Sequence, residues 1–287
     1  MRVRDVLILG KLSISLPVGL TAFLGYVLAN GAITWSAFLP FFGIFFLSSA
    51  ASGLNQIQEY KLDALMIRTQ KRPIPAGIIS PKVAMQWVLL FFLVGVIILS
   101  FTTLYGTLWG IAGLIWYNGV YTPLKRVTAF SVFPGAFVGV IPVVAGWMAA
   151  NGSLGDSRLH FLALFFFIGQ MPHFWLLVLK YGKDYQRAGF PTLHDYFSPI
   201  QIERINLVWM IATFASAILL TITHVFDITF FAAVLSCVSV LLIGWVVRLY
   251  RMTNKAKGIV PGGKLFLVFN SFYLLVMILL SLDKINW

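Results

Sequence analysis

The chain has 287 residues, of which 60% are hydrophobic and only 10% are charged, and its mean hydropathy is +0.90. A soluble domain of this length does not need so much apolar surface, so the composition predicts a polytopic membrane protein. The net charge of +12 could suggest a nucleic-acid-binding protein, but the basic residues are spread over short loops and no soluble domain presents them. With Cys237 as its single cysteine, the chain forms no internal disulfide.

The predicted spans follow from the thickness of a bilayer core, which requires about 20 mainly apolar residues per helix. Nine segments meet this requirement, so we expect an all-α bundle of nine transmembrane helices. In chain order they are approximately 12–29, 34–54, 83–103, 104–122, 127–150, 160–179, 206–223, 228–250 and 264–281.

The basic residues are distributed unevenly over the two sides of this arrangement. Of the 21 Lys and Arg residues, all but Arg158 and Lys284 fall on the side that carries the N-terminus. Because cytoplasmic loops carry an excess of Lys and Arg, we expect a cytoplasmic N-terminus and an external C-terminus. The predicted location is a bacterial cell (inner) membrane, crossed several times.

The most polar stretch is residues 55–73, NQIQEYKLDALMIRTQKRP. If the second helix continues through residue 66, Asn55, Glu59 and Asp63 lie on one stripe, and Lys61 points to the opposite face. Two carboxylates and an amide oxygen suit Mg²⁺, whose remaining ligands are typically water and substrate phosphates. A solvated loop with local ion pairs is the other interpretation, and the spacing does not decide between them.

Arg68 and Arg72 follow these acids, and Pro73 ends any helix that reaches it. Acids flanked by basic groups suit a phosphorylated anion, because a metal bridges its oxygens and the cations complete the clamp.

A second polar loop follows the sixth predicted span and repeats this combination of charges. Lys183 and Asp184 lie in it, four spans after the first acidic loop and on the same side of the membrane. The similarity suggests a two-fold internal repeat, which the sequence itself supports only weakly.

His173 lies within the sixth predicted span, next to Pro172. An intramembrane histidine normally faces the interior of the bundle or a cavity, which makes His173 a functional candidate. The alternative is a neutral imidazole that bonds a backbone carbonyl freed by the proline.

A third polar segment, WYNGVYTPLKR at 116–126, contains Asn118 and Lys125 on one face if the helix continues through Pro123. Tyr117 and Tyr121 have an ordinary interpretation as interfacial aromatics. Lys125 and the neighbouring arginine could serve orientation alone, but they share a side with both acidic loops.

Together these segments resemble the UbiA superfamily of intramembrane prenyltransferases and, within it, the protohaem IX farnesyltransferase (haem O synthase) family. The matching stretches are NxxxExxxDxxMxRTxxRPxPxG at 55–77, YTPLKR at 121–126, PGAFVGVIPVVAGW at 134–147 and QMPHFWLL with KDYQRAGFP at 170–191. MxRTxxRP together with MPHF followed by DYxxAxxP is specific to the haem branch. The resemblance covers most of the chain.

The resemblance implies a single nine-helix domain over 1–287, whose central cavity opens to the cytoplasm beneath a cap formed by loops 55–82 and 180–205. It implies Mg²⁺ as cofactor, farnesyl diphosphate and haem B as substrates, and an oxidase-assembly factor or haem A synthase as a candidate partner in the lipid bilayer. It further implies catalytic metal ligands at Asn55, Glu59, Asp63 and Asp184, diphosphate contacts at Arg68, Arg72, Lys125, Arg126 and Lys183, and acceptor contacts at His173, Asn118 and Tyr121.

The chain departs from the family pattern at three positions. Glu59 stands where the first motif usually has Asp, Lys61 where it often has another, and Ala188 where the second motif has its second Asp. Two other functions therefore stay open: prenyl transfer to a quinone or other aromatic acceptor, and a non-catalytic membrane protein that binds haem or transports a substrate.

Overall fold

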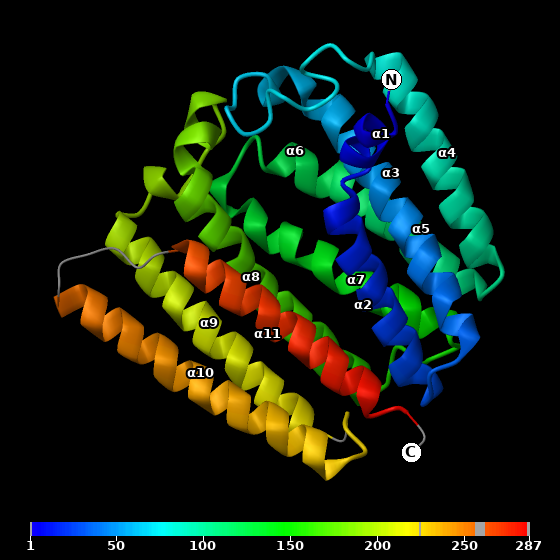
Figure 1. Ribbon diagram of the computed structural model, residues 1–287, viewed down its shortest axis with the longest axis vertical. Coiled ribbons are helices and arrows are strands. Elements are labelled where there is room, and N and C mark those ends of the chain that lie inside the picture. Colours follow the sequence, from blue (N-terminus) through cyan, green and yellow to red (C-terminus); the bar gives the residue numbers. More distant parts are fainter. Residues whose placement is uncertain (1, 224, 256–261, 286–287) are drawn as a thin grey trace. The chain divides into compact units, whose positions relative to one another are not determined.

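The computed structural model describes residues 2–223, 225–255 and 262–285, which form helices and no strand (Figure 1). The all-α prediction is therefore confirmed. The α-helices are α1 Val3–Leu9, α2 Leu12–Asn30, α3 Phe38–Asp63, α4 Pro81–Ser100, α5 Leu104–Ile115, α6 Thr122–Leu124, α7 Val132–Ala149, α8 Ser157–Arg187, α9 Pro199–Ile222, α10 Thr229–Lys255 and α11 Gly262–Leu282. Four short helical turns connect them, η1 Trp35–Ala37, η2 Trp116–Tyr121, η3 Ala129–Ser131 and η4 Leu193–Asp195.

Eight helices of the described chain are long and apolar enough to cross a membrane. They match eight of the nine predicted spans. The other prediction, 104–122, coincides with α5, which has only 12 residues and continues directly into η2 and α6. Because η2 is a π-helical turn, this segment is helical but divided, and it does not count as one long α-helix.

The chain divides into two compact units. Unit 1 contains the residues up to Ser153 together with Lys183–Pro191, and unit 2 contains Leu154–Gly182 and the residues from Thr192 onward. The long helix α8 contributes its first part to unit 2 and its last turn to unit 1.

In unit 1, α3 packs against α2 and α4, and α7 packs against α2 and α5 (Figure 1). The α2–α7 contact is especially close because it is made at glycines. A Cβ atom on Gly146 would overlap the carbonyl oxygen of Ala22, and one on Gly25 would overlap that of Val143. Small residues allow such approaches between membrane helices, where packing replaces the hydrophobic effect as the driving force.

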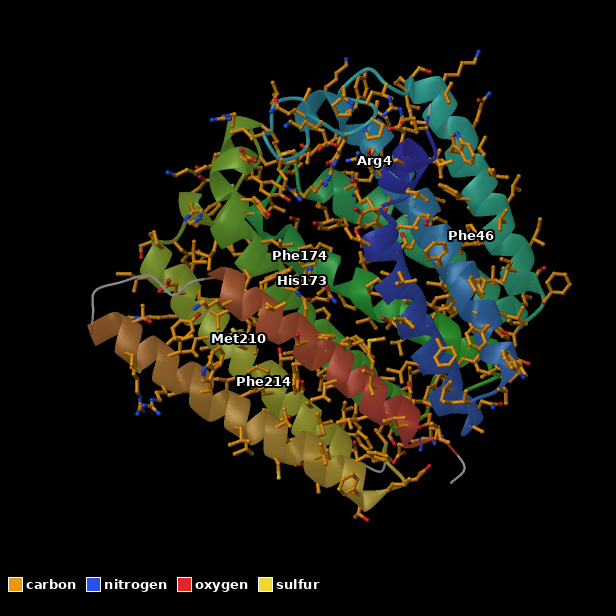
Figure 2. The ribbon with its side chains drawn as sticks, in the orientation of Figure 1. Arg4, Phe46, His173, Phe174, Met210 and Phe214 are labelled. Atoms are coloured by element: carbon orange, nitrogen blue, oxygen red, sulfur yellow. The ribbon has the colours of Figure 1, made fainter. Side chains whose placement is uncertain are left out.

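Aromatic side chains form the core of unit 2. Phe214 on α9, labelled in Figure 2, meets Phe272 on α11 edge-to-face with ring centroids 4.9 Å apart. Phe165 on α8 lies 5.0 Å from Tyr273 on the same α11. Aromatic pairs prefer such offset and edge-on arrangements, so these rings join α8, α9 and α11.

A polar clasp joins the two ends of α10 and α11 that lie near residues 227 and 283. The Asp283 carboxylate accepts the backbone N–H groups of Asp227 and Ile228, each at 2.8 Å. Lys284 is buried and forms ion pairs with both aspartates. The clasp thus satisfies the backbone donors just before α10, which would otherwise lack partners.

Substituting the close-contact glycine gives the first prediction. Gly146→Ala should lower the midpoint of thermal unfolding in detergent, because overpacking typically costs about 1–3 kcal/mol. Gly244→Ala on α10 is the matched control, since nothing lies within 4 Å of its added Cβ. That substitution should raise the midpoint slightly, because alanine favours a helix by roughly 0.5–1 kcal/mol over glycine. Equal midpoints for the two variants would contradict the close α2–α7 packing.

Candidate functional site

Three polar side chains form a buried stripe at the end of α3. Asn55, Glu59 and Asp63 are only 2%, 3% and 1% exposed, and Nδ2 of Asn55 donates to the Glu59 carboxylate at 2.9 Å. The helix therefore includes all three residues of the predicted stripe, although it ends at Asp63. Lys61 is exposed, as expected for the opposite face.

Cations from two later segments neutralise this stripe. Nζ of Lys125 lies 2.5 Å from the Glu59 carboxylate, and Nη1 of Arg72 lies 2.7 Å from that of Asp63. Arg126 is more exposed and approaches Glu59 at 3.7 Å. A buried carboxylate is costly unless it is paired, so these cations are what allows the acids to stay buried.

A further cation, Lys11, reaches the stripe from the segment just before α2. Its Nζ donates to Oδ1 of Asn55 at 3.3 Å. Burial, followed by the charges of Arg72 and Lys125, lowers the pKa of Lys11 to about 7, although Asp63 and Glu59 act in the opposite direction. The sequence predicted only that Lys11 helps to orient the chain in the membrane, because a basic residue directly before a span ordinarily has that role.

The second acidic loop meets the first within unit 1. The backbone N–H of Arg68 donates to the Asp184 carboxylate at 3.2 Å. The guanidinium of Arg68 also contacts Tyr185, with Nη2 3.4 Å from the hydroxyl and the cation 6.0 Å from the ring centroid. The predicted site residue Lys183 is exposed beside them.

An apolar contact accompanies this meeting of the loops. Ala188 is buried in a cluster with Met66 and Phe190, and Leu62 and Tyr185 pack against it. The alanine that replaces the family's second aspartate therefore packs against the segment after α3. The alanine methyl group fills apolar space where an aspartate would carry a charge. Asp184 is therefore the remaining acid of the second motif.

Asn118 attaches the π-helical turn η2 to α3. Its Nδ2 donates to the carbonyl oxygen of Ala51 and to Oε1 of Gln58, each at 3.0 Å. Gln58 in turn donates to the Asn118 carbonyl at 3.1 Å. The ring of Tyr121, on the same turn, lies 5.7 Å from Nζ of Lys125. Tyr121 thus lies beside the cation of the Lys125–Glu59 pair, and Asn118 fixes the turn that carries Tyr121.

His173 belongs to unit 2, on α8, where Figure 2 labels it. Its ring shares a hydrogen bond with the Asn270 side chain and lies 5.0 Å from the ring of Phe266. The structure thus gives His173 a side-chain amide on α11 as its hydrogen-bond partner. Its predicted contact with an acceptor stays a prediction.

The sequence did not single out three residues that complete the site. They are Lys11, Gln58 and Thr122, whose hydroxyl oxygen accepts from Nδ2 of Asn55 at 3.2 Å. Lysine beside a span, glutamine on a helix and threonine before a proline each have ordinary structural roles. No pattern in the sequence separates them from other residues of their kind.

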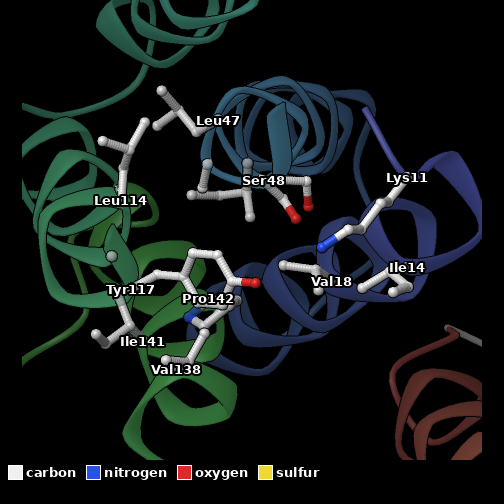
Figure 3. Close-up of a pocket in the computed structure, with 15 residues that line it drawn as sticks. Lys11, Ile14, Val18, Leu47, Ser48, Leu114, Tyr117, Val138, Ile141 and Pro142 are labelled. Atoms are coloured by element: carbon white, nitrogen blue, oxygen red, sulfur yellow. The ribbon is translucent and has the colours of Figure 1, made fainter. Parts of the chain in front are cut away.

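An apolar cavity of about 120 Å³ lies inside unit 1 beside the stripe. Four elements, α2, α3, α5 and α7, contribute its apolar walls. Lys11 and Tyr117 point into it from opposite sides (Figure 3). A pocket of apolar walls with a few polar groups at one end is the ordinary form of a small-molecule site.

The donor atoms of the stripe fit a magnesium ion in part. Carboxylate and amide oxygens are hard ligands, and Oε1 of Glu59 is buried without a hydrogen-bond donor. Within the described ranges, no group of three or more His, Cys, Asp or Glu side chains converges on one point. One or two carboxylates are nevertheless the usual protein ligands of Mg²⁺, because phosphates and water complete its coordination.

Residues 18–270 match the UbiA prenyltransferase family, and the chain belongs to this family. Curated relatives include a protoheme IX farnesyltransferase of Geobacter sulfurreducens, 36% identical over 76% of this chain and 80% of that protein. Another, from Christiangramia forsetii, is 33% identical over 96% of this chain and 91% of the relative. The protein is thus a multi-pass membrane prenyltransferase of the protoheme IX farnesyltransferase type.

Solved structures agree on the fold. A UbiA homolog from Archaeoglobus fulgidus bound to GPP and Mg²⁺ superposes with a TM-score of 0.69, at 15% identity, over 97% of this chain and 98% of that chain. An apo UbiA homolog from Aeropyrum pernix gives a TM-score of 0.73 at 20% identity, over 99% and 98% of the two chains. At this level of identity, the similarity concerns the fold alone.

Two adjacent cations allow the pairing in the stripe to be tested. Lys125→Met should destabilise the protein by about 3 kcal/mol, because Glu59 loses its closest cation and stays buried. Arg126→Met should cost less than about 1 kcal/mol, since the arginine is partly exposed and more distant. Unfolding free energies of the two variants, measured in the same detergent, check this order. An equal loss would mean that Lys125 does not neutralise Glu59.

Proposed function

We propose that the protein transfers a farnesyl group from farnesyl diphosphate to a vinyl group of haem B, with Mg²⁺, and so forms haem O. The supporting observation is the buried cluster of acids and cations at the edge of an apolar cavity, in a chain whose relatives are named protoheme IX farnesyltransferase. Such a cluster suits a diphosphate, and such a cavity suits the prenyl chain attached to it.

Asn55, Glu59, Asp63 and Asp184 would hold the magnesium, whose charge favours departure of the diphosphate. Arg68, Arg72, Lys125, Arg126 and Lys183 would neutralise the departing anion as the C–O bond breaks. Arg72 and Lys125 already lie at the stripe, and both then exchange a carboxylate partner for phosphate oxygens. The chain thus supplies positive charge where negative charge develops.

The transfer of the farnesyl group to haem B requires fewer charged groups. A vinyl carbon of haem B forms the new bond to C1 of the farnesyl cation, water adds to the resulting cation, and a proton is released. Until the vinyl group attacks, the allylic cation must be protected from water. Aromatic rings stabilise such a cation, and Tyr117 and Tyr121 lie beside the site; His173 and Asn118 are the other proposed acceptor contacts.

The charge distribution supports the proposed placement in the membrane. The nine-span arrangement puts Arg158 and Lys284 on one side of the membrane and the other 19 of the 21 basic residues on the opposite side. From this asymmetry we infer the inner membrane of a bacterial cell, a cytoplasmic N-terminus and an external C-terminus. Loops 55–82 and 180–205 then cap a cavity that opens to the cytoplasm, within one domain over 1–287. An oxidase-assembly factor or haem A synthase is the proposed partner.

Activity with defined substrates tests the proposal. Purified protein with haem B, farnesyl diphosphate and Mg²⁺ should yield a hydroxyethylfarnesyl haem, detected by mass spectrometry. Asp63→Asn and Asp184→Asn should each lower kcat about 10²-fold or more, because one carboxylate that acts on the developing charge is lost. Asp156→Asn, in a partly exposed ion pair with Arg158, is the matched control and should retain activity.

The same assay distinguishes the two alternatives. Product from a phenolic or quinone acceptor, without product from haem B, would replace haem by an aromatic acceptor. Absence of product from every acceptor, with unchanged diphosphate binding in Asp63→Asn, would support a non-catalytic haem-binding or transport protein.

Metal binding should depend strongly on the diphosphate. Glu59 and Asp63 are already neutralised by Lys125 and Arg72, so Mg²⁺ alone must compete with a partly buried ammonium and guanidinium. Inorganic pyrophosphate gives both cations a new partner, and it should raise the affinity for Mn²⁺, used as a spectroscopic probe, about tenfold or more. Titration followed by electron paramagnetic resonance measures both affinities. Tight Mn²⁺ binding without pyrophosphate would contradict this coupling.

A further inference from the structure

Gly10 and Lys11 interrupt the helical backbone between α1 and α2. Lys11 adopts φ +46°, in the left-handed region that residues other than glycine rarely occupy. A lysine held in this conformation costs free energy, and such backbone conformations persist only where the surroundings enforce them. The break therefore needs a structural cause.

The side chain of Gln56 on α3 supplies that cause. Gln56 is fully buried, and its Nε2 donates to the carbonyl oxygens of Ile8 and Leu9 at 3.0 and 2.9 Å. The Ser15 hydroxyl donates to the carbonyl oxygen of Gly10 at 3.0 Å from the other side. These bonds satisfy carbonyl groups at the end of α1 and fix the turn against α3.

The turn directs the Lys11 side chain inward. Its ammonium reaches Asn55 at 3.3 Å, at the stripe, and its side chain also lines the apolar cavity (Figure 3). It is the single charged side chain among the described residues that line this cavity. Lys11 therefore stands at the boundary between the polar and the apolar part of unit 1.

The Asn55 contact compensates this ammonium only weakly. A buried charge needs an opposite charge or several hydrogen bonds, whereas Asn55 offers one neutral acceptor at long distance. The two nearby carboxylates, Glu59 and Asp63, have closer cations in Lys125 and Arg72. An orienting charge would have no reason to point into a cavity, because the positive-inside effect acts on exposed loop residues.

We propose that Lys11 binds the substrate diphosphate at the end that carries the prenyl chain, and that Gln56 positions it. This proposal rests on the proposed function, since it assigns a residue to the same site. A prenyl diphosphate is charged at one end and apolar at the other, so its junction must lie where a cation borders an apolar cavity. Lys11 is at that border, and a charge-assisted bond to phosphate is the strong partner that it lacks.

Binding to separate parts of the substrate tests the role of Lys11. The probes are farnesyl thiodiphosphate, which reacts slowly, and farnesol, which lacks the charge. Lys11→Met should weaken thiodiphosphate binding about tenfold or more and leave farnesol binding unchanged. Lys11→Arg should keep most of the thiodiphosphate affinity, and Lys264→Met is the control because Lys264 is exposed on α11, outside both capping loops.

A positioning role predicts a smaller effect in the same direction for Gln56→Met, which keeps the size of the side chain but loses both hydrogen bonds. Equal loss of farnesol and thiodiphosphate affinity in Lys11→Met would overturn the proposal, because it would mean a structural role. Unchanged affinity for both probes would overturn it as well. The thermal midpoint of Lys11→Met should not fall, since the substitution removes a partly buried charge that has one weak hydrogen-bond partner.

Measurements on the wild-type protein distinguish a failure of the proposed function from a failure of the role assigned to Lys11. If it does not bind farnesyl thiodiphosphate at all, the proposed function fails together with the role of Lys11. If it binds the analogue and forms the farnesylated product while Lys11→Met binds as well as the wild type, only the inference about Lys11 fails.

Discussion

Neutralisation of the buried carboxylates on α3 is the constraint on which the rest of unit 1 depends. Glu59 and Asp63 lie where water is largely excluded, so each needs a cation within a few ångströms. Lys125 arrives from the segment after η2, and Arg72 from the turn after α3. The apolar helices must therefore hold the segment after η2 against the end of α3. The hydrogen bonds from Asn118 on η2 to Ala51 and Gln58 on α3 serve this purpose.

Features that depend on neighbouring residues were predictable from the sequence, whereas contacts between distant residues were not. The stripe of Asn55, Glu59 and Asp63 follows from helical spacing alone, and so does the exposed position of Lys61. The spans follow equally well from apolar runs, except at 104–122. There a π-helical turn divides the helix, and hydropathy carries no information on a change in hydrogen-bond register.

The partner of each charge was not predictable from the sequence. Lys125 lies 66 positions from Glu59 and Asp184 lies 116 positions from Arg68, so only the fold brings them together. Lys11 illustrates the same limit more strongly. Its inward position depends on two hydrogen bonds from Gln56 to carbonyl groups, and a carbonyl group is present at every position of a sequence.

The departures from the family pattern have a consistent physical effect on this site. Ala188 gives the second loop an apolar contact in place of an acid, and Lys61 places its charge on the exposed face, away from the stripe. The site therefore holds fewer carboxylates than the family pattern provides, while its cations are retained. An anionic substrate would then contribute a larger share of the oxygen ligands to a bound metal. The proposed dependence on the substrate agrees with the geometry of the stripe, where the carboxylates already have partners in the chain.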